Sequence, residues 1–270
     1  MLANYIFAVH AWHILHGLPW NMDDMQVKAT LTGAAVLAPP SSKHPKRALV
    51  TVDLMERIFH RLDMVKPLDM AVVSCFSMVF YSVTHTGEFT LPILSTFDLT
   101  QHVKPSNISN WLDWNNLEVT VFHLPKTKCL SEGEDVFWSQ QNGITDPKAS
   151  LENHFWINNP PVDGPLFTYR HAKGLHPLTK KVFLDRINRI TSMLGEDSLK
   201  GHGIHIGGTL EFLLRGMPFD VLKFLGHWMN KSFTLYLHQH VTIIVPYIQN
   251  HPVLKEFTHY MMPQVSSTHS

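Results

Sequence analysis

The pattern of hydrophobic and polar positions predicts helices along most of the chain. Apolar side chains recur three or four positions apart in residues 178–194, a spacing that places them on one face of a helix. The most apolar run, residues 70–83, lies in a helix predicted from residue 67 to about residue 84; the run is too short to cross a bilayer, so it predicts a buried helix. Further helical segments are predicted in the first part of residues 1–33 and at residues 51–62, 210–215, 218–226 and 232–240.

Two short segments in the middle of the chain have the composition of β-strands. Residues 117–124, LEVTVFHL, are rich in β-branched and aromatic side chains, and residues 135–139 return after a turn. Residues 140–166 are dense in Asn, Pro and Gly and predict a long loop, with a short helix at residues 151–156 as an alternative. The predicted fold class is therefore mainly α with a small antiparallel β-hairpin or sheet.

A change of composition near the start of the chain predicts a domain boundary. Residues 34–48, AAVLAPPSSKHPKRA, combine Pro, Ser and basic residues as interdomain linkers do. They separate a short first part, residues 1–33, from a large domain over residues 49–263, and residues 264–270 form a tail. The amino-terminal sequence has neither a basic start nor a small-residue cleavage site, so we expect no signal peptide.

Composition narrows the range of functions only slightly. Apolar residues make up 44% of the chain and charged residues 16%, which is typical of a folded domain. The 22 Lys and Arg balance the 22 Asp and Glu, so the charge gives no support for a nucleic-acid partner. The 19 histidines qualify this, because an imidazole near a phosphate can take up a proton. Cys75 and Cys129 lie in unrelated contexts and predict neither a disulfide framework nor a metal pair.

The most specific pattern lies in residues 201–236. His202 and His205 are three positions apart, the tripeptide LGH ends at His227, and Tyr236 follows nine residues after that histidine. This segment resembles the carboxy-terminal signature of the tyrosine recombinases, the phage-integrase type of DNA breaking-and-rejoining enzymes. In that family a His-x-x-Arg pair opens a helix, an LGH or LGW turn follows, and a nucleophilic Tyr comes nine residues later. The spacing agrees at every step, whereas His205 stands where the family has Arg.

A second part of the resemblance lies upstream. The sequence THTGE at residues 84–88 is similar to the family's first box, in which an Arg at the end of a buried helix is followed three residues later by Glu. Glu88 is in place, and His85 again stands for Arg. The family's hairpin lysine corresponds to Lys128, which we prefer because a TK pair at a strand end is the commoner family pattern, or to Lys126. The amino-acid sequence around these boxes is most similar to that of integrase-like proteins of fungal mobile elements.

The resemblance implies a fold and a chemistry. It runs from residue 49 to the carboxy terminus, and it makes residues 1–33 the remnant of an amino-terminal core-binding domain. In the family a Tyr attacks a DNA phosphodiester to give a 3′-phosphotyrosine, a Lys protonates the leaving oxygen, and two Arg stabilise the charge on the non-bridging oxygens. No metal, nucleotide or other cofactor is needed, because the covalent intermediate keeps the bond energy. The residues implied for this site are Tyr236 as nucleophile, Lys128, His202, His227, His85 and His205 as its catalytic neighbours, and Glu88 as a structural residue.

Two histidines at arginine positions predict weak or absent cleavage. An imidazole is cationic only below its pKa of about 6.5, and it cannot make the two-pronged contact of a guanidinium. One lost donor of this kind typically lowers the rate by about 10²–10³. If weak cleavage remains, we expect it to grow as the pH falls from about 8 to 6, because the histidines gain charge beside a phosphate.

The expected partner is double-stranded DNA, and the family arrangement on DNA is a homo-oligomer. The residues expected to contact DNA are Lys126, Lys173, Lys180, Lys181, Arg186 and Arg189. A solvated charged helix face is the alternative interpretation of the same basic segment. A DNA substrate places a eukaryotic recombinase in the nucleus, with KHPKR at residues 43–47 as a modest import signal, and we expect no membrane partner.

Other interpretations stay open at this point. A protein derived from a mobile element can keep the fold and act as a non-enzymatic DNA-binding or scaffold protein. Taken singly, Tyr236 and each histidine are also typical of packed or surface side chains. A zinc site from His202 and His205 with His238 and His240 is a weaker alternative, because no HExxH motif and no Cys or Asp at ligand spacing accompanies them.

Overall fold

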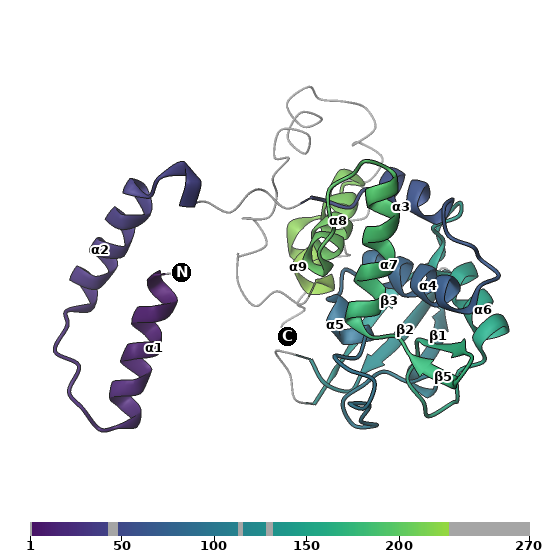
Figure 1. Cartoon of the computed structure of the whole chain (residues 1–270), viewed down its shortest axis with the longest axis horizontal. Helices are drawn as coiled ribbons and strands as arrows, with labels where there is room; N and C mark the ends of the chain where they lie inside the picture. Colours follow the sequence, from purple (N-terminus) through teal and green to yellow (C-terminus); the bar gives the residue numbers. More distant parts are fainter. Residues whose placement is uncertain (1, 43–47, 113–115, 128–131, 227–270) are drawn as a thin grey trace, which may run out of the picture. The chain divides into compact units, whose positions relative to one another are not determined.

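The computed structural model describes four stretches of the chain, residues 2–42, 48–112, 116–127 and 132–226. They form two compact units, a small one from residues 2–42 and a large one from the other three stretches (Figure 1). Among these residues, no helix combines the length and the apolar content needed to cross a membrane.

Two helices make up the small unit. Helix α1 spans Leu2–Leu15, helix α2 spans Asp24–Leu37, and a 3-10 turn follows at Pro40–Ser42. The carboxylate of Asp23 caps α2 by accepting hydrogen bonds from two amides of its first turn. Helix α2 continues into the segment 34–48 whose composition predicts a linker, because the alanines at the start of that segment are good helix formers.

The large unit is mainly helical, as the hydrophobic periodicity predicts. Its helices are α3 (Val52–Phe59), α4 (Pro67–Tyr81), α5 (Thr86–Phe89), α6 (Pro147–Asn158), α7 (Lys180–Met193), α8 (Gly201–Leu214) and α9 (Phe219–Leu225), with a 3-10 turn at Pro105–Asn107. Thr51 caps α3 and Thr179 caps α7, and each hydroxyl accepts a hydrogen bond from an amide of the first turn.

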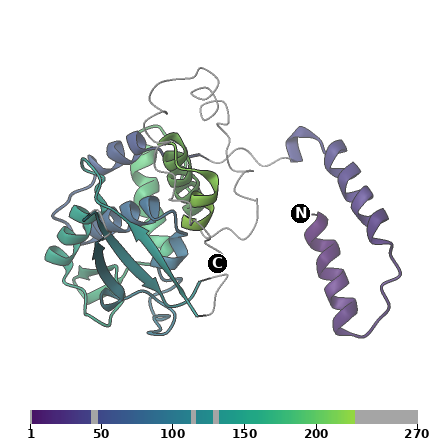
Figure 2. The same ribbon diagram turned by 180° about the vertical axis from the view of Figure 1, so that it is seen from behind.

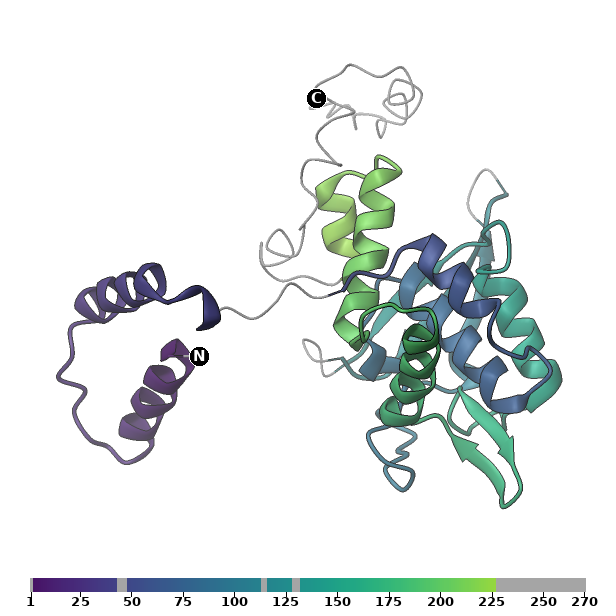
Figure 3. The same cartoon turned by 45° about the horizontal axis from the view of Figure 1, so that its top comes forward.

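Two antiparallel sheets complete the large unit. The first has the order β1-β2-β3 and consists of β1 (Ile108–Leu112), β2 (Glu118–Leu124) and β3 (Glu134–Trp138), which lie side by side in Figure 2. The second is a hairpin of β4 (Thr168–His171) and β5 (Gly174–Pro177), which projects from the body in Figure 3. The predicted hairpin is confirmed in β2 and β3, and so is the fold class, mainly α with small antiparallel sheets.

The sequence pattern missed three strands and helix α2, and it underestimated two helices, α6 and α8, the second of which it predicted only at residues 210–215. Residues 140–166 predict a loop, yet α6 lies within them. Asp146 starts this helix by accepting two first-turn amide hydrogen bonds, and Asn159, with a φ of 46°, ends it in the left-handed conformation. Strand β1 has no alternation of buried and exposed positions, and β4 and β5 have four residues each, so none of the three produces a clear period of two.

Helix α4 forms the centre of the large unit. Every residue from Asp69 to Tyr81 is buried, and the helix packs against α6, α7, α8 and β4 (Figure 3). The predicted buried helix is therefore confirmed. Because α4 is surrounded by helices and strands, the turn at its carboxy-terminal end is held in a fixed place, and the candidate site begins at that turn.

Candidate active site

A tight turn after α4 presents the first histidine of the predicted site. Helix α4 ends at Tyr81, and Val83 then takes a φ of 52°, a left-handed conformation that is strained for a β-branched residue. The Ser82 hydroxyl holds the turn by donating a hydrogen bond of 2.6 Å to the carbonyl of Met78. The turn leaves the side chain of His85 exposed at the start of α5.

Glu88 is tied to the backbone of His85. The N–H of His85 donates to Oε2 of Glu88 at 2.8 Å, which closes the first turn of α5. Burial raises the pKa of Glu88 to about 7, the hydrogen bond from His85 lowers it, and the nearby Glu134 raises it. The carboxyl of Glu88 is therefore partly protonated near neutral pH.

The amino terminus of α8 brings two further histidines to His85. The ring centroids of His85 and His205 are 4.3 Å apart, and the ring of His202 lies 5.9 Å from each of the other two. His202 is half-buried and His205 is buried completely. Two motifs that are far apart in the sequence thus meet in space.

His205 differs from the other two histidines in its environment. Burial lowers its pKa to about 3, and the neighbouring His85 and His202 lower it too, while hydrogen bonding to the backbone of Val83 and Thr84 acts in the opposite direction. His205 is therefore a neutral imidazole at neutral pH. This changes the expected pH response of cleavage, because His205 gains no charge between about pH 8 and 6, and any increase there has to come from another residue.

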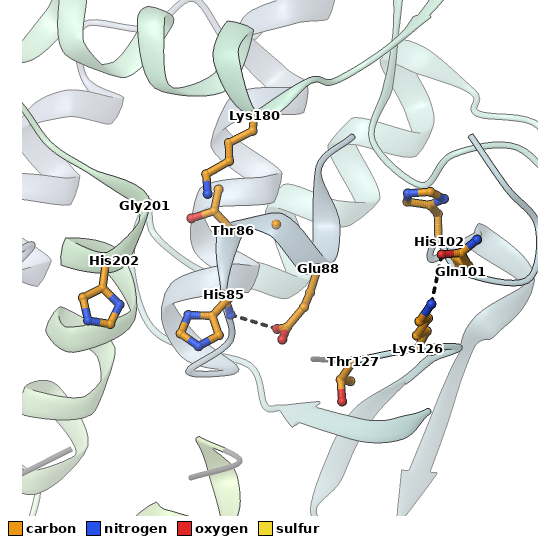
Figure 4. Close-up of a pocket in the computed structure, with 11 residues that line it drawn as sticks. His85, Thr86, Glu88, Gln101, His102, Lys126, Thr127, Lys180, Gly201 and His202 are labelled. Carbon is orange, nitrogen blue, oxygen red and sulfur yellow. Dashed lines mark hydrogen bonds between the residues drawn. The ribbon is translucent and has the colours of Figure 1, made fainter. Parts of the chain in front are cut away.

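A pocket of about 520 Å³ opens in front of these histidines (Figure 4). Its lining residues are His85, Thr86, Gly87, Glu88, Gln101, His102, Lys126, Thr127, Lys180, Gly201 and His202. The structure therefore brings together five of the residues that the sequence singles out: His85, Glu88, Lys126, Lys180 and His202. His205 lies behind His85 and is not part of the lining.

The pocket also contains polar residues that the motifs do not single out. Gln101 accepts a hydrogen bond of 3.3 Å from Nζ of Lys126, and His102 lies beside it. Both belong to the segment between α5 and β1, whose sequence has no recurring pattern that identifies it. Thr86 could have been identified from the sequence as a candidate site residue, because its hydroxyl directly follows His85 in the upstream box.

Four of the six residues expected to contact DNA lie outside this lining. Arg186 binds the buried carboxylate of Asp69 through hydrogen bonds of 2.6 and 2.8 Å, which hold α7 against α4. Its guanidinium is engaged in the fold, so we leave Arg186 out of the DNA surface. Lys181 pairs with an aspartate one helical turn further on. Lys173 lies in the turn between β4 and β5, and Arg189 is exposed on α7.

Some predicted features lie outside the described residues. They are Lys128, His227 and Tyr236, the helix expected at residues 232–240, and the two further histidines of the alternative zinc site, His238 and His240. The roles given to these residues stay predictions from the sequence. In the part of the chain that the structure covers, no group of three or more His, Cys, Asp or Glu is arranged to hold a metal ion.

The two buried histidines predict a loss of stability in acid. His154 donates from Nε2 to the Leu166 carbonyl at 3.0 Å and accepts from Asn158 at Nδ1, and burial lowers its pKa to about 4. The folded pKa of His154 and of His205 is below the unfolded value, so the unfolded state binds the proton first. Each histidine therefore removes about 1.4 kcal/mol of stability per pH unit as the pH falls below about 6.5.

A single variant isolates the contribution of His205. Glu88 acts in the opposite sense, because its folded pKa is raised above the usual value and its stabilising protonation is lost as the pH rises through 7. We therefore compare the pH dependence of the free energy of unfolding in wild type and in His205→Gln, because only the contribution of His205 differs between them. The stability of the variant, measured by urea unfolding between about pH 7 and 5, should fall by about 1.4 kcal/mol less per pH unit. Equal slopes would contradict a neutral His205.

Comparison with known proteins gives a likeness in fold. No protein-family model and no curated protein matches the chain. A XerH site-specific recombinase bound to palindromic difH substrate, in a post-cleavage complex, is similar with a TM-score of 0.51 and 12% identity, over 78% of this chain and 56% of that one. XerA recombinase (TM-score 0.49, 14% identity, 80% and 67% covered) and an FLP recombinase–Holliday junction complex (0.47, 13%, 83% and 56%) are also similar.

The likeness to the XerH recombinase shows that the two chains share a fold, which agrees with the fold that the sequence resemblance predicted. The chain spans 56% of the XerH and FLP chains and 67% of the XerA chain. At identities of 12–14% the likeness extends to the arrangement of helices and strands and not to activity.

Proposed function

We propose that this protein binds double-stranded DNA and is a tyrosine recombinase-like protein whose cleavage step is impaired. One observation supports this proposal most directly: His85, Glu88, His202 and Lys126 line the same pocket. These residues come from separate parts of the chain, and each occupies a position that the recombinase boxes single out. The similar XerH structure is a complex with its difH DNA substrate, which supports DNA as the partner.

The chemistry we assign to the pocket is attack on a DNA phosphodiester. The hydroxyl oxygen of Tyr236 would form a bond to phosphorus as its proton is lost to a neighbouring base, the bond from phosphorus to the 5′ oxygen would break, and a lysine would donate a proton to that oxygen. Lys126 is a candidate for this proton donor because it lines the pocket, and Lys128 is the alternative that the sequence favours. The half-buried His202 is placed to orient the phosphate or assist proton transfer.

Impaired cleavage follows from the two histidines that replace arginines. The transition state places negative charge on the non-bridging oxygens, where a guanidinium fork is most effective. The buried imidazole of His205, with a pKa of about 3, supplies neither a positive charge nor a fork. The exposed His85 can supply one donor at most where the family has a bidentate one.

The alternative function is DNA binding or scaffolding without any cleavage, by a protein derived from a mobile element. It uses the same pocket and the same lysines, so the two functions differ in whether a covalent intermediate forms. We favour residual cleavage over none because Lys126 and His202, the residues that we propose for proton transfer, line the same pocket. A DNA partner also leads us to propose the nucleus as its location.

Removing both pocket lysines should weaken DNA binding and flatten its salt dependence. Each lysine that neutralises a phosphate releases about one counterion, so in Lys126→Ala with Lys180→Ala the slope of log K against log salt should become less steep by about 2. Fluorescence anisotropy with a labelled duplex at about 50 to 200 mM salt measures this slope.

The matched control for these lysines is Lys66→Ala. Lys66 is exposed, pairs with Asp63 at 3.3 Å and lies outside the pocket lining, so its replacement should leave the slope unchanged. If the double variant and the wild type have the same slope, the DNA lies on another surface and the proposed pocket is not its site.

A further inference from the structure

One hydroxyl in the wall of the pocket is buried and has no hydrogen-bond partner among the residues that the structure describes. It is Oγ1 of Thr86, a residue that is only 2% exposed. A buried hydroxyl without a partner loses its hydration and gains nothing in return, so such groups are rare in folded proteins and need an explanation. Thr86 lines the pocket directly after His85, where a bound ligand could accept a hydrogen bond from this hydroxyl.

The amino terminus of α8 faces the same place. Its first residue is Gly201, which lines the pocket, and no side chain of the described residues caps the helix, although the N–H of Gly203 donates to the carbonyl of Lys200 at 2.7 Å. A Cβ at position 201 would collide with the Thr86 hydroxyl oxygen and would lie 3.7 Å from Cε of Lys180. The hydroxyl, the helix terminus and the lysine stem are therefore close neighbours. Figure 4 shows Lys180 extending over Thr86 beside Gly201 and His202.

These three groups share one preference, which is for an anion. A helix amino terminus carries a partial positive charge, a lysine carries a full one, and a hydroxyl can donate a hydrogen bond. The acidic group of the pocket is Glu88, which is half-buried, accepts a hydrogen bond from the His85 N–H and is partly protonated near neutral pH. It therefore opposes an anion less than an ordinary carboxylate would.

We propose that Thr86, together with the first turn of α8 and Lys180, forms a phosphate subsite that positions a DNA phosphate in this pocket. Thr86 is a positioning residue in this arrangement, since its hydroxyl binds the phosphate beside the histidines and takes no part in proton transfer. The subsite supplies hydrogen-bond donors to the phosphate. The two positions that hold arginines in the family hold histidines in this chain. The inference rests on the proposed function, because the phosphate is that of bound DNA.

Replacing the hydroxyl by a methyl group is the direct test. Thr86→Val keeps the shape of the side chain, so it should lower affinity for a DNA duplex by about tenfold without lowering the melting temperature, because the lost hydroxyl makes no hydrogen bond within the described part of the chain. Thr86→Ser keeps the hydroxyl and should bind within about twofold of wild type. The control is Ser77→Ala in α4, which removes another buried hydroxyl without a partner, outside the pocket, and should leave DNA affinity unchanged.

A second experiment, a phosphate titration, distinguishes failure of this subsite from failure of the proposed function. Titrating inorganic phosphate should shift the backbone amide NMR signals of Gly201 and His202 in a saturable way in wild type and Thr86→Ser, and the shift should be lost in Thr86→Val. Wild-type affinity for DNA in Thr86→Val, or a lower melting temperature with no loss of binding, overturns the subsite and leaves the DNA-binding proposal standing. A phosphate response without any duplex binding overturns the proposed function and retains a free-phosphate site.

Discussion

The double variant His85→Arg with His205→Arg is expected to raise covalent attachment to DNA by at least about a hundredfold over the wild-type chain. Two guanidiniums can fork onto the non-bridging oxygens of the phosphate, whereas the present His205 is buried and neutral. The two ring centroids lie 4.3 Å apart, so both replacements act at one place beside His202 and the pocket lysines. The measurement is the fraction of protein trapped as a 3′-phosphotyrosine adduct on a nicked suicide duplex.

Single variants and a nucleophile variant control this experiment. Neighbouring catalytic groups act as a unit, so His85→Arg or His205→Arg alone should recover much less than the pair. Adding Tyr236→Phe to the pair should abolish trapping, because the predicted nucleophile is gone. If the pair traps no more DNA than the wild type while DNA binding is retained, the two histidines are not what limits cleavage, and that part of the proposed function is wrong.

The approach of His85 to His202 was predictable because their two motifs have fixed spacings on regular elements. The end of α4 followed by His85, and the start of α8 followed by His202, are each defined within a few residues, and a family resemblance places such segments side by side. The structure brings them within 5.9 Å, measured between ring centroids. The buried helix α4 was predictable for a related reason, since a long apolar run has few other places in a folded protein.

Long-range contacts decided the features that the sequence could not reveal. The ion pair of Arg186 with Asp69 joins α7 to α4, and nothing in the local sequence of α7 distinguishes this arginine from one that faces solvent. Complete burial of His205 is also a tertiary effect, and it changes the residue from a substitute cation into a neutral ring. Likewise, a net charge of zero does not show that Lys126 and Lys180, far apart in the chain, line one pocket.

The position of α8 depends on two adjacent glycines at its middle. A Cβ on Gly207 would overlap the carbonyl oxygen of Val50, and a Cβ on Gly208 would overlap the carbonyl oxygen of Phe80 in α4. The helix therefore lies directly against the backbone of its neighbours, and backbone atoms cannot rotate away as a flexible side chain can. The backbone atoms in contact with the glycine pair belong to Val50 and Phe80. Because α8 begins at the pocket, the same contact sets the distance between His202 and His85.

The variant Gly208→Ala is expected to destabilise the large unit by about 3 kcal/mol and to lower its melting temperature by roughly 10 °C. The sign is the reverse of that in an open helix, where alanine stabilises by about 1 kcal/mol relative to glycine, because the new methyl group forces α8 away from α4. The control is Gly33→Ala in α2, where an added Cβ meets nothing within 4 Å and should cause no loss of stability. Thermal unfolding followed by circular dichroism measures both variants, and DNA affinity should fall with Gly208→Ala as His202 moves away from His85. A Gly208→Ala protein as stable as wild type would mean that α8 and α4 can separate without cost, and that their contact does not fix the geometry of the pocket.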